Sequence, residues 1–365
     1  MRERNNYDKL FFAIVLILVF SGLFIFASAS LGIFEEGVTS YLQVIGKQIF
    51  FGLILGLAAL FATSKIYYKD WQRLAAPLFF ISILATLLVF VPKIGIASLG
   101  ARRWIDLRFI SFQPSEFMKL GFVIYFASWL SAKKESITDF KKGFLPAMLI
   151  LMIPSAILLS QPDFGTLICI LTAGISMFFV AGGRFKHLAL LAIVGALGFL
   201  LMIYTRPYAM SRIKVFMDPQ SDPLGAGYQI RQALIAVGSG KTFGRGFGQS
   251  IQKFNFLPEP LGDAIFAVAA EEFGFVGSTL LVILFLAFTL RGLRISARSP
   301  EQFSRLLSLG IVILIASQSF INIAAMLGIV PLTGVPLLFV SHGGTALLFS
   351  LMEVGIVLNI SKFTK

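Results

Sequence analysis

The chain has 365 residues, of which 57% are hydrophobic and only 13% are charged, and its mean hydropathy is +0.87. This composition is too apolar for the surface of a soluble domain and is typical of a chain solvated mostly by lipid. A net charge of +13 would suggest nucleic-acid binding in a soluble domain, but here Lys and Arg gather in short clusters between apolar runs. We therefore expect a membrane protein that binds no nucleic acid.

The residues that usually bind metals or form disulfides are scarce. The single cysteine, Cys169, lies in an apolar run, which excludes an intramolecular disulfide and disfavours a thiolate nucleophile. The two histidines, His187 and His342, are far apart in the sequence and form no ligand cluster with metal-site spacing. The sequence therefore predicts no metal site built from protein ligands and no organic cofactor.

Ten apolar windows are each about long enough to cross roughly 30 Å of hydrocarbon. The first has a basic flank but no convincing cleavage site, so we interpret it as an uncleaved anchor. The sequence predicts an all-α polytopic integral membrane protein with about ten transmembrane helices in one domain, 1–365. The windows lie at 10–33, 41–63, 74–92, 110–131, 144–160, 165–183, 187–204, 263–290, 306–328 and 335–360.

The basic residues predict the orientation of these helices. Ten crossings place both termini on one side, and the connections on that side are rich in Lys and Arg, for example at 65–73, 133–142 and 291–305. The short connections on the other side, at 34–40, 161–164 and 329–334, contain none. Because basic loops remain in the cytoplasm, both termini are expected to be cytoplasmic.

Two connections on the expected outer side break this pattern. The 93–109 loop contains Arg102 and Arg103, and the long 205–262 loop between the seventh and eighth helices contains Arg212 and Lys214. Long loops are translocated whatever their charge, which is one explanation. The other is a site for a phosphate or pyrophosphate headgroup, because one guanidinium group can donate two parallel hydrogen bonds to the oxygens of a phosphate. Within the long loop, the stretch from Gly225 to about Ala236 has the pattern of an amphipathic interfacial helix.

Ionisable residues near the ends of three predicted helices are candidates for function or for structure. Glu116 and Lys119 are three residues apart, within ion-pair reach on one helix face, and such a pair either serves a function or only fixes helix positions. Asp163 is expected to cap the sixth helix. Asp263 precedes the eighth helix, where it is either an N-cap or a catalytic carboxylate. Catalysis would require burial or a nearby anionic substrate to restore its basicity.

The glycine-rich run 238–248 does not fit a nucleotide-binding loop. Gly240, Lys241 and Thr242 resemble the end of a P-loop, but Ile235 occupies the position of the required first glycine and no strand precedes the run. We expect these glycines to let the backbone lie close to a lipid headgroup or to turn tightly in a re-entrant loop.

Several motifs in order along nearly the whole chain resemble the SEDS family of FtsW, RodA and SpoVE, the polytopic polymerases of bacterial peptidoglycan. Gln252-Lys253 before Leu257-Pro-Glu259 favours FtsW over RodA. One departure is that Leu261-Gly262 precede Asp263, where the family commonly has a polar pair. The matching stretches are Gly100–Ile105, Gln113–Glu116 with Lys119, Gln161–Asp163, Gly227–Ala233, Leu257–Glu259, Asp263–Ala267, Glu271-Glu272, Gln318, Asn322, Pro331–Pro336 and Ser341–Gly344.

The resemblance implies a glycosyltransferase that polymerises lipid II, with Asp263 as the catalytic carboxylate. Arg102, Arg103, Arg212 and Lys214 would stabilise the leaving pyrophosphate, and Glu116, Lys119 and Ser341 would contribute to substrate binding. A divalent cation, Mg or Mn, could assist. The resemblance also implies the bacterial cytoplasmic membrane and a class B penicillin-binding transpeptidase as partner.

Two other functions remain open from the sequence alone. A lipid II flippase would use the same headgroup cations, and Glu353, toward the inner side of the tenth helix, keeps that alternative open. A non-catalytic scaffold for a transpeptidase is the other. The charged residues otherwise cluster toward the outer half, which favours chemistry there over a polar route across the bilayer.

Overall fold

A computed structural model describes residues 6–98, 101–106, 111–187, 207–223 and 225–364, together with 189, 190, 193 and 195. Nine of the ten apolar windows contain helix, because the backbone groups of an apolar segment must pair within the segment. The remaining window, 187–204, lies mostly outside the described residues.

The helices are arranged in chain order with short connections in the first half and a longer insertion in the second. The first half contains α1 (Lys9–Ala29), α2 (Val38–Lys47), α3 (Leu55–Lys65), α4 (Tyr68–Arg73), α5 (Ala75–Leu87), α6 (Pro114–Ala132), α7 (Leu145–Ser160) and α8 (Phe164–Val180). The second half contains α10 (Pro207–Met217), α11 (Ala226–Ser239), α12 (Ile265–Ala297), α13 (Gln302–Met326) and α14 (Gly344–Ser361). A π-helical stretch, Gln48–Ile54, joins α2 to α3.

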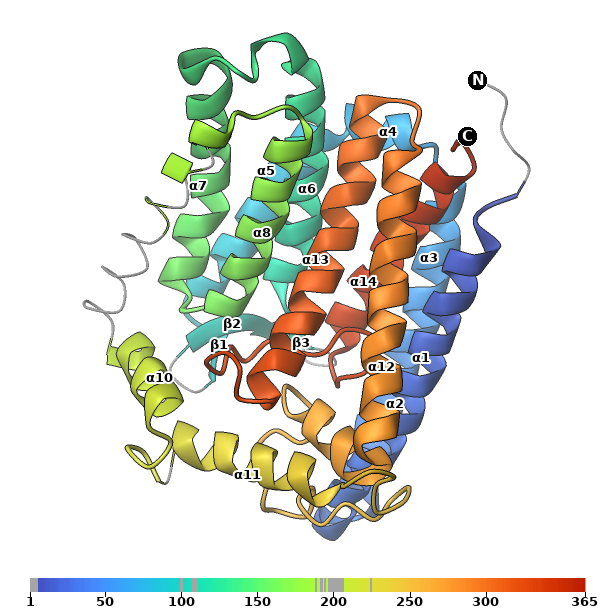
Figure 1. The fold of residues 1–365 in the computed structure, drawn as a ribbon, viewed down its shortest axis with the longest axis vertical. Coiled ribbons are helices and arrows are strands. Elements are labelled where there is room, and N and C mark those ends of the chain that lie inside the picture. Colours follow the sequence, from blue (N-terminus) through green and yellow to red (C-terminus); the bar gives the residue numbers. More distant parts are fainter. Residues whose placement is uncertain are drawn as a thin grey trace.

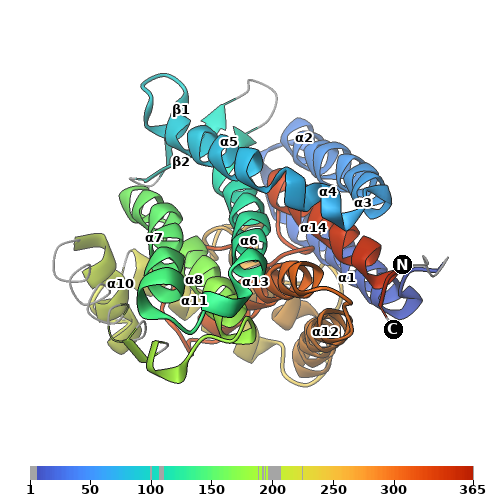
Figure 2. The same cartoon turned by 90° about the horizontal axis from the view of Figure 1, so that it is seen from above.

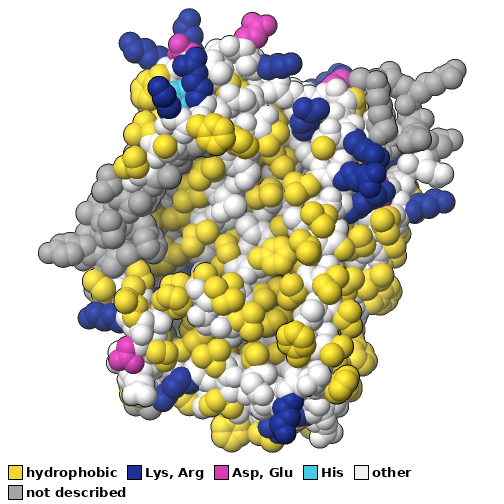
Figure 3. All heavy atoms as spheres, viewed as in Figure 1, with side chains coloured by type: hydrophobic (Ala, Val, Ile, Leu, Met, Phe, Trp, Pro, Cys, Tyr) yellow, Lys and Arg dark blue, Asp and Glu magenta, His cyan; other side chains and the backbone are white. Residues whose placement is uncertain are grey.

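Among the described residues, six helical segments are long and apolar enough to cross a membrane, and two shorter apolar helices accompany them. The chain is therefore a multi-pass membrane protein. Figure 1 shows these helices side by side, with both termini at one end of the bundle, as expected from an even number of crossings. We call the opposite end, which carries α10 and α11, the distal end. In Figure 3 hydrophobic side chains cover the middle of one face, while many Lys and Arg residues gather at the end with the termini.

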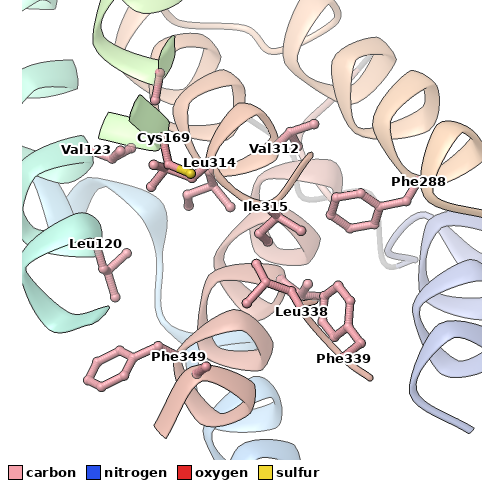
Figure 4. Close-up of a cluster of buried hydrophobic side chains, with 14 of the residues drawn as sticks. Leu120, Val123, Cys169, Phe288, Val312, Leu314, Ile315, Leu338, Phe339 and Phe349 are labelled. Atoms are coloured by element: carbon pink, nitrogen blue, oxygen red, sulfur yellow. The ribbon is translucent and has the colours of Figure 1, made fainter. Parts of the chain in front are cut away.

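The core of the bundle is built around α13. This helix packs against α12, α8 and α6, while α14 packs against α3 (Figure 2). Figure 4 shows Cys169, Val123, Leu314 and Ile315 among the buried apolar side chains at this centre. Cys169 is fully buried, in agreement with the expectation that it is not a thiolate nucleophile.

The expectation of an all-α protein is wrong in one place. The 93–109 loop and the residues that follow form a small antiparallel sheet of β1 (Gly95–Ser98), β2 (Ala101–Asp106) and β3 (Ser111–Phe112), in which β2 is central. Ile96 pairs with Trp104, and Ile105 pairs with Phe112. Backbone pairing and these apolar cross-strand pairs stabilise the segment without a helix.

The predicted eighth helix is also different, because it is divided at Gly274. This residue has a φ of 64°, which is outside helical geometry. Residues 265–272 before the break are almost completely buried, whereas Phe275 directly after it is 69% exposed. The first part is therefore an internal helix of about two turns, and only the second part presents a lipid-facing surface.

The glycine-rich run explains this break. The amides of Arg245 and Gly246 donate to the carbonyls of Glu271 and Glu272 at 3.0 Å, which satisfies the end of the internal helix. The amide of Phe275 in turn donates to Lys241 O at 2.9 Å. A Cβ on Gly274 would lie 2.2 Å from the amide nitrogen of Gly244, so the two backbones can meet only without side chains. The positive φ values of Gly244, Gly246 and Gly248 agree with the tight turns expected of these glycines, and the close approach they allow is to the internal helix.

The last predicted window contains a helix that begins later than expected. α14 starts at Gly344, and the preceding residues 327–343 are irregular. Leu337, Leu338, Phe339 and Val340 are nevertheless buried. This buried irregular segment, which we call the 327–343 loop, passes directly beside Asp263.

Candidate active site around Asp263

Asp263 lies at the start of the internal helix, between α11 and α13. Gln229 Nε2 on α11 donates a hydrogen bond to its Oδ1 at 3.2 Å. Asn322 Nδ2 on α13 donates to its main-chain carbonyl at 2.7 Å and to Val335 O at 2.8 Å. Helices far apart in the sequence thus fix both the side chain and the backbone of this residue.

The alternative interpretation of Asp263 as a helix cap is wrong. The N-cap of α12 is Ala264, and no side-chain hydrogen bond caps this end. Asp163, in contrast, caps α8 as expected, since its Oδ1 accepts from the amide of Thr166 at 3.4 Å. The Asp263 carboxylate is therefore available for another role.

The surroundings of Asp263 make it a stronger base than an ordinary aspartate. Desolvation by the surrounding protein and the nearby Glu259 carboxylate raise the pKa of Asp263 to about 6, against the opposing effects of Gln229 and Arg212. Burial is one of the two conditions expected to restore the basicity of this carboxylate, and the Glu259 carboxylate adds to its effect. A base with a pKa near the working pH is well matched to proton transfer.

Arg212 of α10 faces the same space as Asp263. Its Nη1 donates a hydrogen bond to Leu332 O. A Cβ built on Gly334, where φ is +69°, would lie 3.6 Å from Arg212 Nη2 and 3.9 Å from Asp263 Oδ2. The guanidinium and the carboxylate therefore converge on one point, which the absence of a side chain at Gly334 leaves open.

Lys214 does not share this position. It follows Arg212 by two residues on α10, and residues at this spacing do not lie on one helix face. Its side chain is exposed. The other side of Arg212 borders a small pocket with apolar walls, formed by Val215, Phe216, Ile230, Val330, Pro331 and Leu332.

Ser341 supports the backbone of the site. Its hydroxyl donates to Gly262 O at 2.6 Å and accepts from the amide of Leu337 at 2.8 Å. The amide of His342 donates to Leu261 O at 2.7 Å. Leu261 and Gly262, the nonpolar departure from the family pattern, thus contribute carbonyl groups that tie Asp263 to the 327–343 loop.

Arg102 and Arg103 differ from each other in the structure. The register between β1 and β2 shifts at Arg103, which is an extra residue in β2, and of the two arginines only Arg102 is exposed. Arg103 donates hydrogen bonds to the carbonyls of Gln161 and Pro162, and its Nη1 lies 3.9 Å from Asp163 Oδ1. Arg103 therefore fixes the turn before α8, while Arg102 presents its charge to the surroundings.

Glu116 and Lys119 form the ion pair that their spacing predicts, with Lys119 Nζ 2.9 Å from Glu116 Oε2. Lys119 also donates to Gln318 Oε1 at 2.5 Å, and Gln318 Nε2 donates to Pro336 O at 3.3 Å. Glu353 is buried close enough to Lys119 and Glu116 to interact with both electrostatically. The pair is thereby linked to the 327–343 loop, a connection that the sequence did not indicate.

Glu271 and Glu272 belong to a separate buried network. Ser250 Oγ donates to Glu271 Oε2 at 2.6 Å, and Lys253 Nζ lies 2.8 Å from Glu272 Oε1. Ser28 of α1 donates to Glu272 Oε2 at 2.5 Å. These bonds fasten the 240–262 segment to the internal helix, so we assign them a structural role.

Among the described residues, no group of three or more His, Cys, Asp or Glu side chains could hold a metal ion by itself. Mg²⁺, however, is usually held by one or two carboxylates together with substrate phosphates. Asp263 and the neighbouring Glu259 supply such a donor set, because Glu259 lies near enough to influence the pKa of Asp263. The residues therefore fit a cation that arrives with a phosphorylated substrate.

A basic carboxylate facing a guanidinium at the distal end of a multi-pass helical bundle defines a membrane-embedded protein with an acid–base site. The FTSW_RODA_SPOVE family of cell cycle proteins matches residues 8–365. Stage V sporulation protein E of Bacillus subtilis (strain 168) is 39% identical over 363 residues, 100% of this chain and 99% of that protein. The chain belongs to the FtsW, RodA and SpoVE family.

Other relatives agree with this assignment. A protein of Geobacter sp. (strain M18) named probable peptidoglycan glycosyltransferase FtsW is 36% identical over 361 residues, 99% of this chain and 98% of that protein. A chain in the structure "Structural coordination of polymerization and crosslinking by a peptidoglycan synthase complex" has a TM-score of 0.80 at 28% identity, covering 97% of both chains. RodA of Thermus thermophilus has a TM-score of 0.71 at 25% identity, covering 97% of this chain and 96% of RodA.

Proposed function

We propose that this peptidoglycan glycosyltransferase polymerises lipid II, an undecaprenyl-diphosphate-linked disaccharide peptide, into β-1,4-linked glycan strands. The reaction class follows from the family and from full-length relatives named peptidoglycan glycosyltransferase. The mechanism rests on one observation. The Asp263 carboxylate and the Arg212 guanidinium both lie beside the position where a side chain on Gly334 would begin.

In this mechanism Asp263 is the general base. Its carboxylate accepts the proton of the acceptor sugar's 4-hydroxyl while that oxygen bonds to the anomeric carbon of the donor. The bond between this carbon and the donor diphosphate breaks, and the diphosphate leaves with the electron pair. One displacement converts an α-linked donor into a β-linked product.

Arg212 stabilises the departing diphosphate. Negative charge develops on this group in the transition state, and a cation already in place lowers the barrier. A divalent cation held by Asp263, Glu259 and the phosphates would neutralise part of the same charge. Arg102 and Lys214, both exposed, would attract the headgroup from outside the site.

The site operates on the outer face of the bacterial cytoplasmic membrane. This location rests on about ten spans with both termini cytoplasmic, which makes the distal end extracytoplasmic. The shared end of the termini and the Lys and Arg residues gathered there support this orientation. We further propose a single transmembrane domain over 1–365.

A class B penicillin-binding transpeptidase is the proposed partner. Support comes from the similarity to a chain of a peptidoglycan synthase complex, described as coordinating polymerization and crosslinking. A partner that crosslinks strands as they are made would bind at the distal end, where the product emerges.

Incubation of the purified protein with labelled lipid II in detergent tests the proposal, with Asp263→Asn as the matched variant. We expect glycan polymer from the wild type and none from the variant. Detergent micelles have no separate compartments, so polymer cannot be a result of transport. Absence of polymer from the wild type, with and without a transpeptidase, would favour the flippase or scaffold alternatives.

A further inference from the structure

The residues just before α14 are hydrogen-bonded to the two residues that precede Asp263. Ser341 Oγ bonds to Gly262 O at 2.6 Å and the His342 amide bonds to Leu261 O at 2.7 Å, so this end is fixed next to the catalytic segment. α14 has 18 residues, and its macrodipole places partial positive charge at Gly344.

Several hydrogen-bond donors at this end have no acceptor within the described part of the chain. Gln48 Oε1 accepts from the Gly343 amide at 3.2 Å, but the amides of residues 344–346 have no such partner among the described residues. Thr345, only 7% exposed, has a hydroxyl that likewise has no partner there. Because side chains of a helix lean toward its N-terminus, this hydroxyl is directed to the same place as the amides.

A cation borders this site. Gly343 and Gly344 have no side chains, the backbone of Gly344 packs against Phe51 and Gly52, and the exposed His342 ring stacks on Phe26 with centroids 5.8 Å apart. Lys47, the last residue of α2, is near enough to His342 for electrostatic interaction. Amides at a helix N-terminus, a hydroxyl and a nearby ammonium together form a typical phosphate-binding set.

We propose that the N-terminus of α14 binds the diphosphate of the acceptor lipid, while Arg212 faces the leaving diphosphate of the donor. The inference rests on the proposed function, in which each transfer uses two lipid-linked substrates. The donor diphosphate is bonded to the reacting carbon and therefore belongs beside Asp263 and Arg212. In the acceptor, the length of the disaccharide separates the diphosphate from the reacting hydroxyl, so the acceptor diphosphate requires a second site.

The arrangement of the helices agrees with two separate sites. In Figures 1 and 2, α10, which carries Arg212, and α2, which ends at Lys47, lie on opposite sides of the molecule. Asp263 lies between the two sides. Its carboxylate and the Arg212 guanidinium both lie near Gly334, and the carbonyl of the preceding Gly262 accepts a hydrogen bond from Ser341. The two lipids would thus approach the base from different directions.

A single-transfer assay separates the two sites. The donor is a lipid II analogue without the 4-hydroxyl, so that it cannot act as acceptor. The acceptor is either lipid II or the same disaccharide peptide with a methyl group in place of the lipid diphosphate. Thr345→Val removes the hydroxyl at nearly constant volume, and Thr345→Ser restores it.

We expect Thr345→Val to raise the KM for lipid II as acceptor about tenfold, since a hydrogen bond to a charged group is lost, with little change in kcat. Transfer to the diphosphate-free acceptor should be unchanged, and Thr345→Ser should recover most of the affinity. Arg212→Met should slow transfer to both acceptors. Equal effects of Thr345→Val on both acceptors, or none on either, would overturn the inference. Failure of the wild type to transfer to lipid II would instead refute the proposed function.

Discussion

The surroundings of Asp263 determine how readily its carboxylate accepts a proton. Burial is the main cause of its raised pKa, and the carboxylate of Glu259, four residues earlier, raises the pKa further. Gln229 and Arg212, from two other helices, lower it. The balance leaves a carboxylate that is largely ionised at neutral pH and still able to accept a proton.

This balance predicts the pH dependence of polymerisation. The rate should fall as the pH decreases through about 6, because the base becomes protonated. Gln229→Leu removes a donor to the carboxylate, so the pKa should rise and the rate should fall at a higher pH. Glu259→Gln removes a nearby negative charge, so the fall should occur at a lower pH. Profiles of kcat/KM against pH for the three proteins check this, and identical midpoints would contradict it.

The buried ion pair at Glu116 and Lys119 predicts unequal effects of single substitutions. Lys119→Met leaves the carboxyl groups of Glu116 and Glu353 without their cation, whereas Glu116→Gln leaves Lys119 beside Glu353 and Gln318. Removing one partner of a buried pair costs roughly 3–5 kcal/mol, so Lys119→Met should approach that range and Glu116→Gln should cost less. The double variant should lose less than the sum of the singles. Thermal unfolding and polymerisation rates of all three variants measure this, and additive losses would mean that the residues act separately.

At the scale of elements, the break in α12 allows the bundle to contain an internal helix of about two turns. The 240–262 segment donates amides to the carbonyls before the break and accepts the amides that follow it, and Gly244 and Gly274 let the two backbones meet. The break also separates Asp263 from the lipid-facing part of α12. Sequence periodicity could not reveal it, because residues 263–290 form one uninterrupted apolar window.

Gly274→Ala should therefore destabilise the protein strongly. The substitution combines a positive φ with a Cβ 2.2 Å from a backbone nitrogen, and backbone strain alone costs roughly 1–3 kcal/mol. Gly46→Ala is the matched control, since an added Cβ there meets nothing within 4 Å and α2 should gain helix propensity. Unfolding temperatures in detergent compare the two, and similar values would show that the break tolerates a side chain.

At the scale of the whole molecule, the sequence predicted the helical bundle and the shared side of the termini, because lipid imposes length and charge rules on every span. The ion pair, the cap at Asp163 and the helix at 226–239 were also predictable, since each depends on residues close in sequence. The sheet at 95–112, the late start of α14 and the contacts of Asp263 with Gln229 and Arg212 were not. These depend on pairing between distant segments, which periodicity and local spacing do not encode.

Cysteine labelling can test the orientation of the whole molecule. The single native thiol, Cys169, is fully buried and should not react. The labelling of each introduced cysteine can therefore be measured without background from the native chain. Gln220→Cys, at the distal end, should react with an impermeant maleimide in intact spheroplasts. Lys133→Cys, between α6 and α7, should react only after permeabilisation. The reverse pattern would place the active site in the cytoplasm and contradict the proposed function.

The 327–343 loop has a consequence for the interpretation of mutant screens. Irregular backbone inside a membrane protein lacks the solvent that would normally hydrate it, so amide side chains take the place of water. Gln48, Gln318 and Asn322 each donate to a carbonyl of this loop, at 3.2, 3.3 and 2.8 Å. Substitutions at these positions would leave carbonyl groups of the loop without hydrogen-bond donors and would displace Asp263, although the substituted side chains contact no sugar. When substitution of a polar residue within the bundle abolishes activity, that residue can be one that only hydrogen-bonds the loop backbone in place of water. Such a result does not by itself identify a residue that takes part in the reaction.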